Sequence, residues 1–177
     1  MQSCAAQSTI VVEKVHEYID NPRKDLSSAG VTRIIDNNNV LRKYEGTWKG
    51  QLNGISYNLL FKKITRTDDG LTEDLLILKY HIKNTQTNTT IDNTLNLPDD
   101  SVYVPSVGYL DDKDFYQLSF NGGQNKCGIS GQLFISVFNN KMGITMLQVP
   151  GFSPIANSCN EAVTIFPPSQ PIRLIKQ

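Results

Sequence analysis

From Gly46 onward, hydrophobic and polar residues alternate in short runs that are separated by turn-forming residues. This spacing is typical of an all-β sandwich or barrel. The clearest pair of runs, residues 47–52 and 55–62, flanks Asn53-Gly54. Asn-Gly favours a two-residue turn with two positive φ angles, which matches the twist of antiparallel strands. The pattern therefore predicts a β-hairpin over residues 47–62.

Further runs predict that much of the remaining chain is strand. Asp68-Asp69-Gly70 predicts a turn into residues 75–82, which are apolar on both faces at first and then alternate, as in a central strand. Asn139-Asn140 and Gly122-Gly123 mark further reversals, because Asn and Gly tolerate positive φ angles. The other strand candidates are a weak one near Thr90-Ile91 and residues 102–110, 115–120, 129–138, 142–149 and 162–166.

Helix is expected in only two short places. Val11, Val15 and Ile19 have helical spacing, although the β-branched cluster around Val11 leaves the period of that segment ambiguous. Asn39 is the candidate N-cap of a single turn at residues 40–44. Both segments precede the first hairpin, so the expected helical content is minor.

The length of 177 residues indicates one domain, which we place at residues 31–177, after an N-terminal tether or arm at residues 1–30. The predicted fold is all-β, an antiparallel β barrel or strongly curved sheet of about eight to ten strands. The 17 Lys and Arg residues balance the 17 Asp and Glu residues, and no basic run restores a local charge, which argues against nucleic acid as a partner. No stretch approaches the ~20 consecutive apolar residues that a membrane-spanning helix needs.

The N-terminus carries a compartment signal. Ser3-Cys4 followed by Ala5-Ala6 resembles the end of a bacterial lipoprotein signal, in which a small residue precedes the lipid-bearing Cys. If an upstream segment has been removed, Cys4 is the lipidation site and the protein is anchored in the periplasm or at the outer membrane. It is secreted if Cys4 is not lipidated. The alternative is an ordinary Cys in a floppy terminus.

The cysteine count supports the same compartment. Three Cys is an odd number, and a lipidated Cys4 leaves Cys127 and Cys159 to form a disulfide. In the chain-entropy model, closing a loop of that length stabilises the fold by roughly 3–4 kcal/mol. Disulfides persist outside the cytoplasm, so a lipoprotein N-terminus favours the bridge. The alternative is two buried free thiols.

One segment suggests a family. Tyr44-Glu45-Gly46-Thr47-Trp48-Lys49-Gly50, followed by a short hairpin and then Asp74-Leu75-Leu76-Ile77, resembles a family of uncharacterised small secreted lipoproteins of Gram-negative bacteria with a Gly-Thr-Trp-Lys-Gly motif. The resemblance covers about residues 30–85 and extends to the remainder only in pattern. It implies a cell-envelope lipoprotein and carries no activity to transfer.

A weaker resemblance links the chain to the calycin barrels, which include lipocalins, fatty-acid-binding proteins and avidins. In these a short helical turn leads into a first strand marked Gly-x-Trp, as residues 40–44 and Gly46-Thr47-Trp48 do here. The chain departs from them because no helical lid follows the first strand and no second lipocalin motif is present. This resemblance implies a barrel or curved sheet and no particular ligand.

Enzymatic chemistry has little support in the sequence. His16 and His81 are the only imidazoles, and neither belongs to a cluster with metal-ligand spacing. Cys127-Gly128-Ile129-Ser130-Gly131 lacks the first Gly of a nucleophile elbow and lies between strands. The acidic pairs are typical of turns; they are Asp68-Asp69, Asp99-Asp100 and Asp111-Asp112 with Asp114. We therefore expect no catalytic residue, no metal site and no cofactor.

Four aromatic residues fall on the apolar phases of consecutive predicted strands, so we expect them to share one interior, as core or as ligand-facing residues. They are Trp48, Tyr57, Phe61 and Tyr80. Small barrels are usually filled by side chains, whereas larger ones leave a ligand cavity, and packed core is the favoured alternative here by about two to one.

Two functions from different classes follow. The first is a non-catalytic cell-envelope lipoprotein whose β domain binds a small apolar or amphipathic ligand. The second is a lipoprotein that binds another protein through its surface, as an inhibitor or immunity protein in the periplasm. In both, membrane contact is through the lipid anchor only. A contiguous apolar pocket of roughly 300 Å³ or more favours the ligand, whereas a filled interior with an exposed loop patch favours the protein partner.

Overall fold

The computed structural model describes residues 8–19, 21, 25–124, 128–148, 164–168 and 170–177. In this part of the chain the fold is all-β with minor helix, as predicted: eleven strands form one sheet, beside two 3-10 turns and one short α-helix. The strands are β1 (Ser8–Val11), β2 (Val31–Ile35), β3 (Gly46–Leu52), β4 (Ile55–Asp68), β5 (Leu71–Asn84), β6 (Thr90–Asn93), β7 (Gly108–Leu110), β8 (Tyr116–Phe120), β9 (Gly131–Phe138), β10 (Lys141–Gln148) and β11 (Ile172–Lys176). The helical elements are η1 (Val12–Lys14), α1 (His16–Ile19) and η2 (Val40–Lys43).

Turn chemistry explains the three tight hairpins. Asn53-Gly54, Asp69-Gly70 and Asn139-Asn140 all adopt positive φ angles, between 45° and 81°, and each joins two neighbouring antiparallel strands. Only Gly, Asn and Asp accept these angles at low cost. The predicted turns at these three places are therefore confirmed, and β4 and β5 pair along all fourteen residues of each strand.

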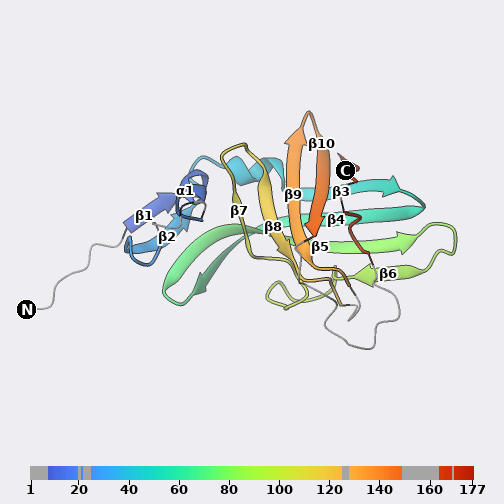
Figure 1. Cartoon of the computed structure of the whole chain (residues 1–177), viewed down its shortest axis with the longest axis horizontal. Coiled ribbons are helices and arrows are strands. Elements are labelled where there is room, and N and C mark those ends of the chain that lie inside the picture. The colour runs from blue at the N-terminus through green and yellow to red at the C-terminus, as the bar shows by residue number, and fades with distance from the viewer. Residues whose placement is uncertain (1–7, 20, 22–24, 125–127, 149–163, 169) are drawn as a thin grey trace, which may run out of the picture.

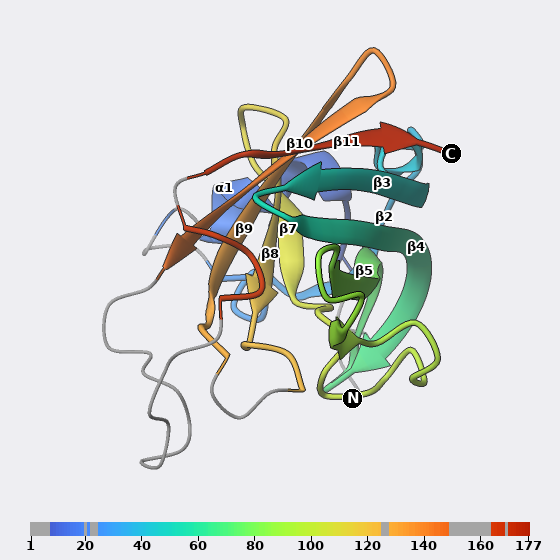
Figure 2. The same cartoon turned by 90° about the vertical axis from the view of Figure 1, so that its right-hand side faces the viewer.

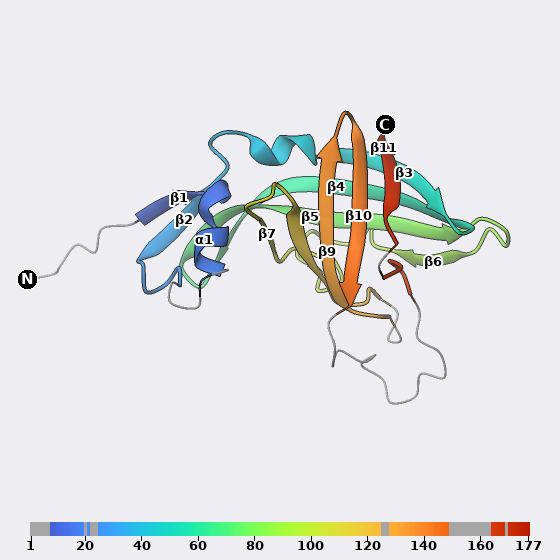
Figure 3. The same ribbon diagram turned by 45° about the horizontal axis from the view of Figure 1, so that its top comes forward.

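The sheet runs in the order β1-β2-β5-β4-β3-β11-β10-β9-β8-β7, with β6 beside β5. It differs from the prediction in two ways: it has eleven strands, and it is mixed, because β1 pairs with β2 and β2 with β5 in parallel. Figures 1 and 3 show β3–β5 running across β8–β10. β11 joins these two groups of strands, and Figure 2 shows it beside β3. The main hydrophobic core lies between the groups, since both contribute their inward residues to it.

Strand pairing does not close this sheet within the described residues. Other hydrogen bonds occupy the edge of β5 between its pairings with β2 and β6. The backbone N–H of Leu76 donates to the Tyr116 hydroxyl (3.0 Å), that of Leu78 to the carbonyl of Pro105 (2.9 Å), and that of Tyr80 to a Thr94 hydroxyl (2.9 Å). These bonds satisfy buried donors that would otherwise be costly to leave unpaired.

The central strand β5 is buried on both faces between residues 75 and 80, as its apolar pattern predicted. Leu76 and Leu78 face the main core, whereas Leu75 and Ile77 face a second small core that they form with Val104. The segment that contains Val104 thus covers the outer face of β5.

Residues 102–110 were predicted as one strand, which is wrong for most of that range, because only β7 (Gly108–Leu110) is strand. Pro105 has no N–H to donate to a ladder, and Val104 turns inward to the second core. Of the predicted strand at 162–166, residues 164–166 are not in a strand, and 162–163 lie outside the described residues.

Three of the observed pairings between distant segments were absent from the prediction. β2 pairs with β5, and β11 pairs with both β3 and β10, which joins the two halves of the sheet. η2 occupies the predicted turn, but its cap differs: Asn39 has φ 54° and makes no side-chain cap bond. The carboxylate of Asp36 instead accepts the N–H of Val40 at 2.8 Å.

The described part of the predicted N-terminal arm packs against the sheet. β1 pairs with β2, and Val12 and Val15 are buried in the main core. The helical spacing of Val11, Val15 and Ile19 corresponds to η1 and α1, which together make only two turns.

Candidate functional site

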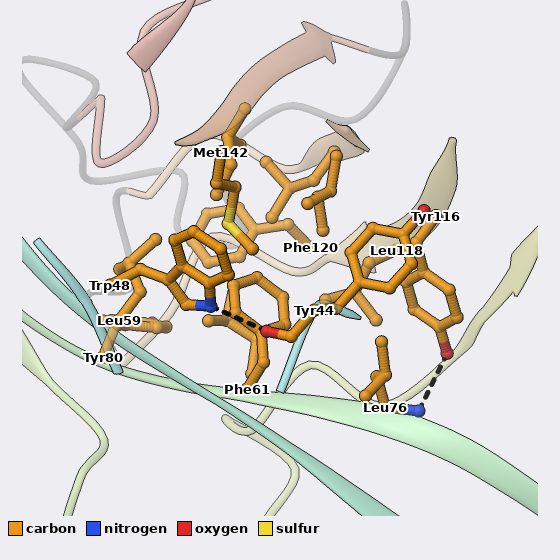
Figure 4. Packing of buried hydrophobic residues seen from close by; sticks show 14 of the residues in the cluster. Tyr44, Trp48, Leu59, Phe61, Leu76, Tyr80, Tyr116, Leu118, Phe120 and Met142 are labelled. Atoms are coloured by element: carbon orange, nitrogen blue, oxygen red, sulfur yellow. Dashed lines mark hydrogen bonds between the residues drawn. The ribbon is translucent and has the colours of Figure 1, made fainter. Parts of the chain in front are cut away.

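The four predicted interior aromatics lie in one core. Trp48, Tyr57, Phe61 and Tyr80 are each at most 3% exposed and belong to the same cluster of buried residues. Figure 4 shows Trp48, Phe61 and Tyr80 packed among other aromatic and aliphatic side chains, with Met142 above them. Tyr80 and Tyr57 each lie about 6 Å, centroid to centroid, from Phe166, which the sequence had not marked as part of this interior.

Each buried polar group of these aromatics has a partner. Trp48 Nε1 donates to the Tyr44 carbonyl at 2.7 Å, and the Tyr57 hydroxyl donates to the Ile165 carbonyl at 3.3 Å. The Tyr80 hydroxyl donates to the buried carboxylate of Asp92 at 3.0 Å. Burial raises the pKa of Tyr57 to about 12, and burial with the nearby Asp92 charge raises the pKa of Tyr80 further. These side chains are satisfied core residues and present no free polar group to a ligand.

A small hollow lies between β7 and the N-terminal segment. Its volume is about 20 Å³, and Val12, Leu41 and Tyr116 are among the residues that line it. A void of this size holds about one water molecule. It therefore cannot accommodate an organic ligand.

One of the hollows at the surface lies between the segment that leads into β7 and the ends of β8 and β9. This groove, here called the 100–107 groove, has a volume of about 730 Å³. It is lined by Asp100, Ser101, Val102, Val104, Pro105, Ser106, Val107, Ser119, Phe120, Asn121, Ser130, Gly131 and Gln132. Asp100 is the single charged residue of this lining, and the others are apolar or uncharged polar side chains.

Both ends of the groove segment are held by hydrogen bonds. The Val102 carbonyl accepts from Asn121 Nδ2 (2.6 Å), the Ser106 hydroxyl accepts from the Arg66 guanidinium (3.0 Å), and the Val107 carbonyl accepts from the Ser119 N–H (2.8 Å). Together with the buried side chain of Val104, these bonds fix the segment at several points. The groove is thus formed in the protein before any partner binds.

The rim of the groove exposes apolar surface. Val102 is 77% exposed, Val107 63% and the adjacent Tyr103 41%. Large apolar side chains that are exposed together, with polar groups around them, are typical of an interaction site. Sequence reasoning missed this site because it interpreted residues 102–110 as strand, and the signal against that interpretation was Pro105.

Two members of the acidic pairs, Asp111 and Asp99, have structural roles. Asp111 caps the β7–β8 turn, where its carboxylate accepts the N–H groups of Lys113 and Phe115, both at 2.9 Å. Asp99 bonds Lys62 and Lys79 at 2.5 and 2.6 Å, and these two lysines lower its pKa.

His81 lies on a strand beside the Thr90 hydroxyl, at 3.0 Å. Across the described ranges, no group of three or more His, Cys, Asp or Glu side chains is arranged to hold a metal ion. In the same ranges no helix has the length and apolar character of a membrane span. The predicted lipidation and disulfide residues Cys4, Cys127 and Cys159 all lie outside the described residues.

Comparison with known protein families, with curated proteins and with solved structures finds no match.

Proposed function

We propose that this protein is a non-catalytic binding protein of the bacterial cell envelope, and that it engages another protein through the 100–107 groove. The observation that carries the proposal is the contrast between interior and surface. The interior aromatic side chains are buried and their polar groups are paired, whereas Val102 and Val107 remain largely exposed at the edge of a groove of about 730 Å³. This combination favours a protein partner over a ligand held inside the fold.

The lining of the groove indicates the kind of surface that fits it. Val102, Val107 and Phe120 offer apolar contact, and hydroxyl and amide side chains such as Ser119 and Gln132 offer hydrogen bonds without net charge. An extended protein segment supplies both complements, since it carries apolar side chains on a backbone of N–H and C=O groups. The anchoring of the groove segment favours binding, because little of the site must be ordered when the partner arrives.

The cell-envelope location rests on the sequence. Ser3-Cys4 resembles the end of a lipoprotein signal, and the segment around Trp48 resembles the Gly-Thr-Trp-Lys-Gly motif of small secreted lipoproteins. A barrel of calycin type is part of the same proposal, with the hydrogen bonds between β5 and the segments around Tyr116 and Pro105 in place of a closing strand pair. In this setting the protein acts as an inhibitor or immunity protein on a partner that reaches the periplasm.

A second candidate is a small amphipathic ligand in the same groove. The volume of about 730 Å³ exceeds the roughly 300 Å³ at which ligand pockets begin, and the lining mixes apolar and polar side chains. Native mass spectrometry of protein purified from its own membranes tests this candidate directly. A bound small molecule that is lost in Val107→Asp would favour it over the protein partner.

Site-specific photocrosslinking in the native host tests the protein partner. A photoreactive amino acid is placed at Val102 or at Val107, and at Phe138 as the control, because Phe138 is equally exposed but lies at the other end of β9. We expect one common protein to be crosslinked from both groove positions and not from the control. Adding Gln132→Arg, which places a charge in the groove, should abolish both crosslinks.

Crosslinks that are absent from the groove positions would overturn the proposal. Equal crosslinking from Phe138 would do the same, since it would indicate random contact. Circular dichroism on each variant checks that the fold is retained.

A further inference from the structure

A second surface lies on the outer face of β9, β10, β11 and β3, at the end opposite the groove. Pairing registers place Phe138, Lys141, Ile175 and Lys49 in one row across these four strands, because residues directly opposite one another project to the same face. Arg173 lies in the next outward row, beside Gly143. Figures 1 and 3 show the β9–β10 tip projecting from the body next to the C-terminal strand. We call these five residues the basic-apolar face.

The apolar members of this face are well exposed. Phe138 is 77% exposed and Ile175 61%, and Phe138 immediately precedes the Asn139-Asn140 turn. A large aromatic side chain at a projecting hairpin tip has no core contacts for its ring, and exposing that apolar surface to water is unfavourable. Partner surface that accepts an apolar group would remove this cost.

The face carries three exposed cations. Lys49, Lys141 and Arg173 are exposed, and none forms an ion pair with a carboxylate among the described residues. Cations elsewhere do form such pairs; they are Lys14, Lys43, Lys62, Lys63, Arg66 and Lys79. The chain has no net charge, and three of the cations without such a pair lie together on this face.

Carboxylates are absent from the rows that carry these cations, within the described strands. Beyond Lys49 the outward row continues through Asn58 and His81. In the β7–β8 turn, Asp114 is bonded to Lys43. The face thus combines positive charge with protruding apolar side chains.

The geometry points to the surface of an anionic lipid bilayer as the partner of the basic-apolar face. Lysine and arginine side chains are attracted to anionic headgroups, while an exposed Phe and Ile enter the boundary between headgroups and acyl chains. A single lipid anchor gives only marginal membrane binding, and a basic patch is one of the second signals that make it stable. The inference adds a membrane contact to the anchor that the sequence predicted, and it does not rest on the function of the groove.

This orientation leaves the groove accessible. Gly131, at the start of β9, lines the 100–107 groove, and Phe138, at its end, belongs to the basic-apolar face. Seven residue steps at about 3.3 Å each separate them by roughly 23 Å. A bilayer bound at the hairpin tip would therefore not cover the groove.

Vesicle co-sedimentation with the full chain tests the inference. Cys4→Ser removes any acyl contribution, and the vesicles are phosphatidylcholine alone or equal parts of phosphatidylcholine and phosphatidylglycerol. We expect binding to the anionic vesicles only, weaker at high salt. Lys141→Gln should weaken it about fivefold, and Phe138→Ser about tenfold.

Two control variants distinguish binding through this face from nonspecific binding to vesicles. Lys113→Gln removes an exposed lysine of the β7–β8 turn, and Leu147→Ser removes a 57% exposed apolar side chain from the far end of β10. Both should bind like the parent protein. In Phe138→Trp, fluorescence should shift to the blue with anionic vesicles, against a constant background from the buried Trp48.

Three results would overturn the inference. The first is equal binding to the two kinds of vesicle, or no binding to either. The second is a loss in the control variants as large as that in Lys141→Gln or Phe138→Ser. The third is binding to soluble heparin, with the same dependence on Lys141, in the absence of vesicle binding, because the partner would then be a soluble polyanion.

Discussion

The substitution Tyr116→Phe tests how the open side of the sheet is held together. Tyr116 is 2% exposed, and its hydroxyl oxygen accepts the backbone N–H of Leu76 at 3.0 Å. The bond is drawn at the right of Figure 4. It links β5 to Tyr116 on the side where β5 and β7 are not paired as strands. Phe retains the ring, including its contact with Tyr44 at 5.8 Å between centroids, and removes only the oxygen.

The expected cost follows from the state of Leu76. Leu76 is fully buried, and its backbone N–H donates to the Tyr116 hydroxyl, so the variant leaves a buried donor without an acceptor. Such a donor costs about 1–3 kcal/mol in the free energy of unfolding. The void of about 20 Å³ beside Tyr116 has room for one water, which would bring the loss to the lower end of that range.

Urea denaturation measures the loss, and an unchanged m value would show that the compactness of the two states is the same. Hydrogen exchange of the Leu76 amide gives a local reading, which should accelerate more than that of its neighbours. The control is Tyr44→Phe, whose hydroxyl donates 2.9 Å to the Asp114 carbonyl in a partly exposed turn. That carbonyl can turn to water, so the control should cost less, about 0.5–1.5 kcal/mol.

A loss below about 0.5 kcal/mol in Tyr116→Phe, with unchanged exchange at Leu76, would refute the reasoning. It would show that strand pairing elsewhere carries the closure. A loss equal to that of Tyr44→Phe at every probe would also contradict the special role of this bond.

Three further predictions concern the core, alkaline pH and the cysteines. Trp48→Ala should lower the free energy of unfolding by roughly 3–5 kcal/mol, because it leaves a cavity at a fully buried site. A loss under about 1 kcal/mol in chemical denaturation would contradict that burial. Burial raises the pKa of four tyrosines, that of Tyr57 to about 12, so the native state keeps protons that the unfolded chain loses above about pH 10. The free energy of unfolding, measured by urea titration, should therefore be at its full value below pH 10 and fall from pH 10 to 12. A free energy of unfolding that does not change over this range would refute the prediction. Mass spectrometry of protein from its own membranes should find Cys4 acylated and Cys127 bonded to Cys159, and an unmodified Cys4 with two free thiols would remove the cell-envelope proposal.

Local chemistry was enough to predict the hairpins. Asn53-Gly54, Asp69-Gly70 and Asn139-Asn140 reverse the chain because few other residues accept positive φ angles in succession, and this property does not depend on the rest of the fold. The alternating runs on either side of these turns then determine which side chains turn inward. For this reason the burial of Trp48 and Tyr80 was also readable from the pattern.

Pairing between distant segments was decided only by the tertiary structure. β11 lies about 120 residues from β3, and nothing in either run specifies the other as its neighbour. Residues 102–107 are apolar enough for a strand, yet Val104 packs under β5 and Pro105 bonds Leu78, which produces the groove instead. The N-cap of η2 was likewise taken by Asp36 in place of Asn39.

The sequence by itself thus determined the class of fold, the tight turns and the buried aromatic positions, because each depends on residues close together in the chain. The tertiary structure decided the strand order, the partners of the buried polar groups, the 100–107 groove and the basic-apolar face. Those features depend on which surfaces meet after folding: Lys49, Lys141 and Arg173 become one charged surface only because β11 lies between β3 and β10. Contacts between segments far apart in the chain are selected by the packing of the whole core, which short-range patterns do not specify.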